Sequence, residues 1–432
     1  MDNSRIRRDG NARRVVDGRI FVNIPVDVAA HEISSRRCQH RLASLDGMTV
    51  INRPADERET IEREAIERRI GTLIRETCGA DPSLLGSDAC AGVYADTLRQ
   101  ALTSSEGGKR LRAMLVMAVF DALHDETLHD ETLRDDVRDL ACAIEVFQTA
   151  ALVHDDIIDD SDMRRGRPSA HRALAETMRR SFDDVSPRLA ASMGGGLGIM
   201  LGDLLATSSV AIVNGAASRM PDGAAIIDSF LLMHRDVEIG QVLDLAAERI
   251  DLNDTTSMRS NSLAVFRWKT ASYTTIAPIR LGLLACGVDH DTARRLSERI
   301  GTPLGTAFQL ADDLLDVCAD PTVTGKPVGG DIREGKRTVL LADALDAAGD
   351  DDAAYLRRCF EAAGRDDDDV RRVIALFHGT GAVQRSRERI TDLWRQSREA
   401  IEDSRRALRR PDRFATVMTD ACARFIPADL RD

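Results

Sequence analysis

The sequence predicts an all-α protein built as one large helical bundle. Apolar residues recur at helical spacing from about residue 55 to the C-terminus, and no run alternates apolar and polar residues as a half-buried strand does. Ala, Leu, Asp and Arg dominate the 432 residues, while aromatic residues make up only 4%. Ala, Leu and Arg favour helices, whereas strands favour aromatic and β-branched residues.

The individual helices follow from apolar stripes and from the Gly or Pro residues between them. The first is predicted over 56–78, where Ile61, Ile66, Ile70 and Ile74 share one face opposite Glu and Arg side chains. Gly and Pro then mark many of the gaps. The later helices are predicted over 88–104, 109–123, 135–158, 170–181, 189–214, 222–248, 256–286, 290–318, 336–348, 352–363, 367–378, 380–408 and 411–424.

Residues 1–52 differ from the helical domain predicted over 53–432. They are rich in arginine and lack helical apolar spacing, so we predict a disordered basic N-terminal extension. A start of translation at Met48 is an alternative. A targeting peptide is disfavoured, because Asp2, Asp9 and Asp17 interrupt the arginines.

Composition excludes several classes of protein. The net charge of −12 argues against nucleic acid as a partner, since such proteins need a basic surface. The eight cysteines form no C-x-x-C pair, which fits free thiols in the cytoplasm rather than a zinc site or a disulfide framework. No continuous apolar run approaches the ~18–20 residues of a transmembrane helix, and no secretory signal is visible.

The first acidic cluster occupies residues 155–159 and follows an apolar run over 147–153. On a helix, Asp155 and Asp159 lie on one face about one turn (~5–6 Å) apart. Two such carboxylates need a cation between them, and Mg²⁺ prefers hard oxygen ligands while keeping several waters. Arginines at 164, 165 and 167 follow, and their guanidinium groups match phosphate oxygens.

The second acidic cluster repeats this arrangement. Asp312 and Asp316 share a helix face after an apolar run over 304–310. A Gly-rich basic loop over 325–338 follows, and its backbone can approach phosphates closely. One Asp-Asp-x-x-Asp run is weak evidence, because acidic helix faces are common in a chain with 30% charged residues. Two copies, each followed by cations, favour a diphosphate-binding metal site.

A third motif, residues 106–112, contains Gly107-Gly108 and opens a predicted helix. The glycines let the backbone approach an anion, and Lys109 and Arg112 are one helical turn apart. A helix start with ordinary surface charges is the simpler interpretation of this motif alone. The two acidic clusters make an anion site the better one.

Taken together and in this order, these motifs resemble the trans-isoprenyl diphosphate synthase (polyprenyl synthetase) family. The matching segments are 107–112, 155–159, 240–244, 269–270, 312–316 and 325–338. The resemblance extends from about residue 56 to the C-terminus. Ala113 departs from it, standing where the family usually has proline, which we expect to affect helix entry more than chemistry.

The resemblance implies an isoprenoid synthase fold around a deep central cavity, usually homodimeric. It implies head-to-tail condensation of isopentenyl diphosphate with an allylic diphosphate. Asp155, Asp156 and Asp159 would hold two Mg²⁺ ions, and Asp312 a third with help from Asp313 and Asp316. Metal ions and Lys269 would stabilise charge on the departing diphosphate, which then serves as the base. His154 is accordingly expected to be a hydrogen-bonded structural residue.

The resemblance also assigns substrate contacts, residue by residue. The positions that match contacts to isopentenyl diphosphate are Lys109, Arg112, Gln148 and Arg165, the family often having His in place of Gln148. Those around the allylic diphosphate are Arg164, Lys269, Thr270, Gln309, Lys326 and Lys336.

Product length depends on side chains upstream of Asp155, beside which the growing tail would run. Ala150 and Ala151 are too small to stop the tail at C15, whereas Phe147, one turn deeper, could form a floor. We therefore predict a product longer than C15, with geranylgeranyl diphosphate favoured. A C30–C50 polyprenyl synthase, a non-catalytic partner subunit and a terpene cyclase are the alternatives.

Overall fold

The computed structural model describes residues 15–16, 19–20, 54–124, 131–318 and 328–431. The chain divides into two compact units, Met1–Glu57 and Arg58–Asp432. Within the extension predicted over 1–52, the described residues are β1 (Val15–Val16) and β2 (Arg19–Ile20), which pair antiparallel. The rest of that extension lies outside the described residues.

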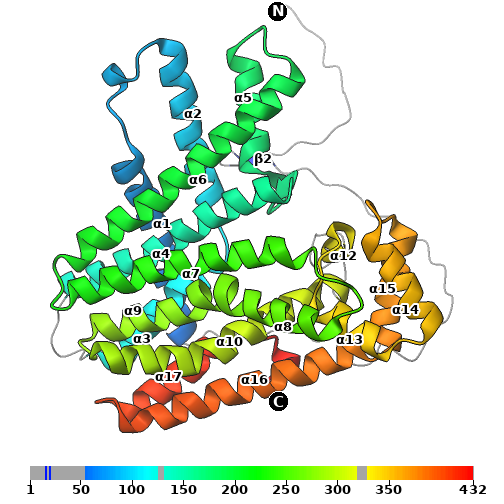
Figure 1. Ribbon diagram of the computed structural model, residues 1–432. Coiled ribbons are helices and arrows are strands. Elements are labelled where there is room, and N and C mark those ends of the chain that lie inside the picture. The colour runs from blue at the N-terminus through cyan, green and yellow to red at the C-terminus, as the bar shows by residue number, and fades with distance from the viewer. Residues whose placement is uncertain (1–14, 17–18, 21–53, 125–130, 319–327, 432) are drawn as a thin grey trace, which may run out of the picture. The chain divides into compact units, whose positions relative to one another are not determined.

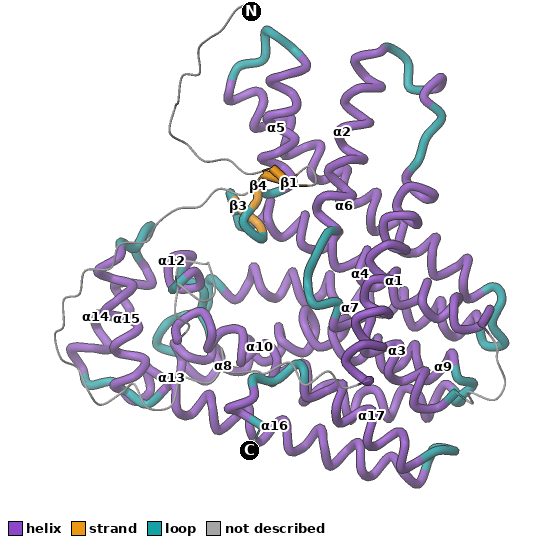
Figure 2. Tube along the Cα trace, turned by 180° about the vertical axis from the view of Figure 1, so that it is seen from behind, coloured by secondary structure: helices purple, strands orange, loops and turns teal. Residues whose placement is uncertain are grey.

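The described part of the chain is almost wholly helical, which confirms the predicted all-α class (Figure 2). Among the described residues of the second unit, the only strands are β3 (Met163–Arg164) and β4 (Arg167–Pro168), which pair with each other. The helices are α1 (Pro54–Cys78), α2 (Asp88–Ser105), α3 (Leu111–Leu123), α4 (Glu131–Ile158), α5 (Ala170–Ser181), α6 (Pro187–Ala217), α7 (Gly223–Ala247), α8 (Thr255–Val265), η3 (Phe266–Ile276), α9 (Ala277–Ala285), α10 (His290–Cys318), α12 (Gly330–Glu334), α13 (Val339–Ala347), α14 (Asp350–Glu361), α15 (Asp367–Gly379), α16 (Ala382–Asp403) and α17 (Pro411–Ala423), with short 3₁₀ turns η1 (Pro82–Leu84), η4 (Ser404–Arg406) and η5 (Ala428–Leu430).

Helix α4 is the central element of the second unit, and it ends in the first acidic cluster. Its residues from Asp136 to Ala150 are buried except for Arg138 and Gln148, because α3, α5 and α6 pack around it. Helix α10, which carries the second cluster, packs on η3 and on α16, the long orange helix of Figure 1. Both clusters therefore emerge from core helices, as the apolar runs before them predict.

The prediction of one continuous helix over 256–286 is wrong in one respect, because the middle third of this segment is a π-helix. The chain is α-helical over α8, π-helical over η3 and α-helical again over α9. The wider turn brings Thr275 against α10, where its hydroxyl donates to the carbonyl oxygen of Gly301 at 2.7 Å as well as to that of Ala271 at 3.1 Å. Apolar periodicity does not separate α from π turns, and π segments often mark functional sites.

The β3–β4 hairpin is the other local feature absent from the predicted helices. Arg165 and Gly166 form its two-residue turn and both have positive φ, 52° and 73°, as in type I′ turns. This turn places Arg164 against Asp156 at the end of α4 and Arg165 against the carbonyl oxygen of Glu106 in the loop after α2.

Helix α6 is long and apolar enough to cross a membrane by length and composition, with a window of mean hydropathy 1.7. Here it lies between other helices, packing on α4, α5 and α7. A core helix passes the same test as a membrane span, so composition alone does not define its role.

Candidate active site

The end of α4 presents the first acidic cluster. The amide of Asp159 donates to the Asp155 carbonyl at 2.9 Å, so helical geometry continues through the cluster and both carboxylates stay on one face. The neighbouring His154 has another role, because its Nε2 lies 3.2 Å from the Ile199 carbonyl oxygen and 3.4 Å from an Asp203 carboxylate oxygen on α6. His154 is thus hydrogen-bonded to the scaffold, as expected.

Lys269 reaches the cluster from η3. Its Nζ lies 3.0 Å from Oδ1 of Asp155 and 2.6 Å from Oδ2 of Asp244 on α7. Gly240 makes this approach possible, since a Cβ there would lie 2.2 Å from the Lys269 amide nitrogen. Burial alone would lower the pKa of Lys269, but the carboxylates of Asp155 and Asp244 outweigh it and raise that pKa.

Asp156 points away from this face. It is 2% exposed, and its Oδ1 accepts from Nε of Arg164 at 2.8 Å and from a terminal nitrogen of the same guanidinium. Asp156 therefore holds Arg164 in place. Arg164 remains within 4.0 Å of Asp155, so its positive charge still faces the cluster.

Lys336 reaches the cluster from the segment after α12. Its Nζ lies 2.7 Å from Glu334, 3.6 Å from Asp331 and 3.8 Å from Asp159. Burial raises the pKa of Asp159 to about 6, and the negative charge of Asp155 adds to this while Lys336 opposes it. A cation near Asp159 therefore favours the ionised form of that carboxylate.

The three aspartates of the second cluster have different surroundings. Asp312 is exposed, whereas Asp313 is buried and its Oδ1 accepts from Nε2 of Gln309 at 3.1 Å. The side-chain oxygen Oε1 of Gln309 accepts from the Thr270 hydroxyl on η3 at 2.9 Å, which ties α10 to the helix that carries Lys269. Burial, with Asp331 nearby, raises the pKa of Asp313 well above its usual value.

Asp316 acts as a cap rather than presenting its carboxylate with Asp312. Its two carboxylate oxygens accept from the amides of Gly330 at 2.9 Å and Asp331 at 3.1 Å, at the start of α12. Its own carbonyl oxygen accepts from the amide of Gly329 at 2.8 Å. Of the two residues predicted to share a helix face, Asp312 is therefore exposed, whereas Asp316 anchors the segment that carries Lys336.

The glycine-rich loop after α2 is held by a buried ion network. Arg110 has a φ of 51° and donates from Nε to Glu67 at 2.6 Å and from a terminal nitrogen to Glu145 at 3.3 Å. The amide of Gly107 donates to the same Glu67 carboxylate at 2.8 Å. The loop is thereby fixed between α1 and α4.

The predicted helical pairing of Lys109 with Arg112 is wrong. Helix α3 begins at Leu111, after the left-handed Arg110, so Lys109 lies outside the helix and is exposed. Arg112 is buried, stacks over the Tyr273 ring at 4.3 Å and donates to Thr274 at 2.8 Å. A one-turn spacing does not apply across a left-handed residue.

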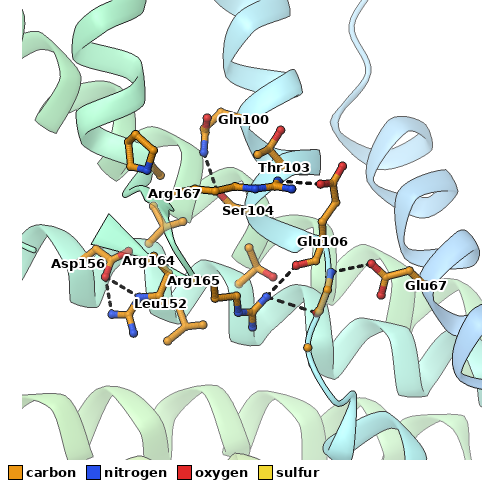
Figure 3. A pocket seen from close by; sticks show the side chains of 16 residues that line it. Glu67, Gln100, Thr103, Ser104, Glu106, Leu152, Asp156, Arg164, Arg165 and Arg167 are labelled. Atoms are coloured by element: carbon orange, nitrogen blue, oxygen red, sulfur yellow. Dashed lines mark hydrogen bonds and ion pairs between the residues drawn. The ribbon is translucent and has the colours of Figure 1, made fainter. Parts of the chain in front are cut away.

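A cavity of about 570 Å³ lies between the loop, α2, the end of α4 and the β3–β4 hairpin (Figure 3). Arg164, Arg165 and Arg167 line it, together with Gly107 and Gly108. The guanidinium of Arg165 donates to the carbonyl oxygens of Glu106 at 2.9 Å and Gly107 at 3.4 Å. Lys109, Arg112 and Gln148 are not among its lining residues, and Gln148 lies half-buried on α4.

An aromatic group surrounds Phe147, two helical turns before Asp155. Its ring centroid lies 4.0 Å from that of His234, 6.0 Å from Tyr273 and 6.5 Å from Phe230. Burial lowers the pKa of His234 to about 4, so this imidazole is neutral at pH 7. Of the two predicted alanines, Ala150 is buried and Ala151 is half-buried.

Sequence reasoning assigned no role to several residues that complete the site. Asp244, Asp331 and Glu334 each contact one of the two lysines, and Glu67 and Glu145 hold the loop. A polar residue within an apolar helix was the available signal for Asp244. Lys326 lies outside the described residues.

The oxygen donors of the site suit a hard divalent cation. Within the described ranges, no group of three or more His, Cys, Asp or Glu side chains is gathered closely enough to enclose a metal ion. Mg²⁺ does not need such a cage, because it keeps waters and shares substrate phosphate oxygens. Asp155, Asp159 and the exposed Asp312 offer carboxylates of this kind, and Lys269, Lys336 and Arg164 lie within 4.0 Å of the first two.

The fold and this site together define an enzyme that acts on diphosphates. Its acidic clusters lie at the ends of two core helices, and lysines from two other segments contact the first cluster. The chain belongs to the polyprenyl synthetase family, whose model matches residues 95–377. It is a trans-prenyl diphosphate synthase, and hence a prenyltransferase.

Three similar proteins place the chain within the family. It is 30% identical over 312 residues to a short chain isoprenyl diphosphate synthase of Methanothermobacter thermautotrophicus, spanning 70% of this chain and 84% of that one. It is 30% identical to the octaprenyl diphosphate synthase of Escherichia coli, spanning 66% and 76%. The structure of geranylgeranyl pyrophosphate synthase from Corynebacterium glutamicum, complexed with isoprenyl diphosphate and magnesium, matches with a TM-score of 0.70 and 28% identity over 83% and 98% of the chains.

Proposed function

We propose that this enzyme condenses isopentenyl diphosphate with an allylic diphosphate and extends the product beyond C15, with geranylgeranyl diphosphate favoured. The main support for this reaction is that Lys269 and Lys336 both lie within 4 Å of the first acidic cluster. Acidic residues and cations thus alternate where a metal-bound diphosphate would need both. The test is incubation of the purified chain with isopentenyl diphosphate, Mg²⁺ and each allylic primer, followed by analysis of product length.

The site residues divide the work as follows. Asp155, Asp159 and Asp312 would hold Mg²⁺, for which we propose three ions. Bound Mg²⁺ supplies positive charge to the leaving diphosphate. Lys269, Lys336 and Arg164 add fixed cations around that diphosphate, while Asp156, Asp313 and Asp316 keep their neighbours in position.

Isopentenyl diphosphate would bind on the other side of α4, beside Arg165 and the backbone of Gly107-Gly108. The anchored guanidinium of Arg165 and the loop at the cavity provide a rigid cationic rim. Lys109, which is exposed, would add a cation from the loop, while Arg112 and Gln148 would act from within the bundle. Charge developing on the allylic carbon is then quenched by the double bond held nearby.

Replacing Phe147 with alanine is expected to shift the main product to a longer chain. Phe147 is 2% exposed and lies two turns before Asp155, in the path that we propose for the tail, so its loss removes a large side chain from that path. The check is product length by chromatography. Phe120→Ala is the matched control, because Phe120 is equally buried on α3 and is not in contact with the Phe147 ring group. An unchanged product distribution would exclude Phe147 as the floor.

Two alternatives stay open beside this proposal. A C30–C50 product is supported by the match to an octaprenyl diphosphate synthase. A non-catalytic subunit is disfavoured by the complete acidic clusters, and product formation by the single chain with Mg²⁺ would exclude it. We also propose a cytoplasmic location, which the seven free cysteines among the described residues support.

We propose a homodimer formed through α6 and α7. Among the residues that the structure describes, nine of the 14 large apolar side chains that are exposed lie on these two adjacent helices. Such a concentration on one face is typical of an obligate interface. The residues are Leu189, Met193, Ile199, Met200, Leu231, Leu232, Ile239, Val242 and Leu245.

Met200→Glu is expected to weaken dimer association at least ~100-fold, because a two-fold interface counts the loss of each buried apolar side chain twice. Light scattering after gel filtration measures the change from dimer to monomer. Leu84→Glu is the matched control, since Leu84 is 82% exposed but lies outside α6 and α7. A dimer that withstands Met200→Glu would place the interface elsewhere.

A further inference from the structure

Lys269 lies between two aspartate carboxylates, one inside and one outside the first acidic cluster. Asp155 belongs to the acidic cluster, whereas Asp244 lies on α7 and outside both clusters. The separation from Nζ is 2.6 Å for Asp244 and 3.0 Å for Asp155, so Asp244 is the closer acceptor. All three side chains are between a fifth and a third exposed, which limits screening by water.

The carboxylate of Asp155, whose Oδ1 accepts from Lys269, is also one that we propose to hold a divalent cation. An ammonium group and Mg²⁺ cannot both contact one carboxylate oxygen without strong mutual repulsion. A cation that takes this oxygen therefore displaces the lysine from Asp155. A lysine can do so at small cost, because its head moves on a flexible four-carbon stem.

Asp244 provides the place to which this lysine can withdraw. Gly240 and Asp244 are on the same face of α7, one turn apart, and the close backbone contact at Gly240 fixes η3 against that face. Lys269 can then lose Asp155 and keep a full ion pair with Asp244. Without Asp244 the displaced ammonium would be left partly buried and unpaired.

The same arrangement recurs at Lys336. Its Nζ contacts Asp159 of the cluster at 3.8 Å and has nearer partners outside it, Glu334 at 2.7 Å and Asp331 at 3.6 Å. Each lysine thus pairs with one cluster carboxylate and with a closer acceptor outside the cluster. Two independent elements, η3 and the segment after α12, share this geometry.

We propose that Asp244 is a positioning residue, which receives Lys269 when a divalent cation displaces it from Asp155. Lys269 serves as the counter-ion of the cluster in the metal-free enzyme and is held ready beside the diphosphate site once the cation is bound. The inference rests on the proposed magnesium-dependent function and adds a step of cation exchange to it.

The test is a double-mutant cycle on Mn²⁺ binding without substrate, read by the electron paramagnetic resonance of the free ion. Lys269→Met is expected to tighten binding about tenfold, because the competing ammonium is gone. Asp244→Asn is expected to weaken binding about tenfold while Lys269 is present, and less than about twofold in the Lys269→Met background. Lys109→Met, which removes an exposed lysine, is the control and should change the affinity less than about twofold.

The outcomes separate the inference from simpler ones. If Asp244→Asn weakens Mn²⁺ binding equally in both backgrounds, the negative charge of Asp244 acts on the ion directly through space and not through Lys269. If the effect is larger in the Lys269→Met background, Asp244 binds the ion itself. Either result overturns the exchange. If the wild-type enzyme binds no Mn²⁺ and forms no product, the proposed function is overturned as well. If the enzyme forms product but Asp244→Asn gives an equal or a larger effect in the Lys269→Met background, only this inference is overturned. Circular dichroism of each variant verifies that it folds, and Lys269→Gln repeats the test if Lys269→Met does not.

Discussion

Replacing Asp155 with asparagine is expected to lower kcat at least ~10²–10³-fold, the effect of removing one group that stabilises transition-state charge. The substitution removes a carboxylate on the exposed face of the first cluster and the partner of Lys269 at 3.0 Å. It keeps the size and shape of the side chain, so the fold should be unaffected. Initial rates at saturating substrates and varied Mg²⁺ measure the loss, and the Mg²⁺ dependence should shift to higher concentration.

Asp160→Asn is the matched control for this experiment. Asp160 is adjacent to the cluster, but it is exposed and pairs with Arg172 on α5 at 2.8 Å. Its replacement should leave kcat within about twofold, as for an exposed ion pair of small energy. A kcat for Asp155→Asn close to that of Asp160→Asn would contradict a metal-binding role for the first cluster.

Replacing Arg110 with methionine is expected to lower the free energy of unfolding by ~3–5 kcal/mol, because it leaves the buried carboxylate of Glu145 unpaired. The side chains of Arg110 and Glu145 are 2% and 3% exposed. Arg110 also donates to Glu67 and to the carbonyl oxygen of Ser105, so three contacts of the loop are lost together. Denaturant unfolding followed by circular dichroism measures the change.

Two further variants make this result specific. Lys109→Met removes the neighbouring exposed lysine and should change stability by no more than ~0.5 kcal/mol. The double variant Arg110→Met and Glu145→Met should recover part of the loss, because an apolar pair needs no counter-charge. Stability of Arg110→Met equal to that of Lys109→Met would show that the buried network does not hold the loop.

Much of the fold was predictable because helical periodicity is a local property of the sequence. The apolar stripes of α1, α4 and α10 are visible in the order of residues, and so are the acidic clusters at the ends of the last two. The π-helical turn of η3 was not predictable in this way. It depends on contacts with Gly240 and Gly301, which lie on other helices.

The sequence by itself determined the helical class, the two acidic clusters and the family, because spacing and residue type are sufficient for each. The tertiary structure decided which members of each cluster are available. Asp155 and Asp159 contact Lys269 and Lys336, and Asp312 is exposed, whereas Asp156 and Asp316 are occupied by Arg164 and by the amides of α12. It also decided the pairing of Lys269 with Asp244. The physical reason is that hydrogen-bond partners distant in sequence compete for the same oxygens, and only the packing of helices determines which partner lies close enough.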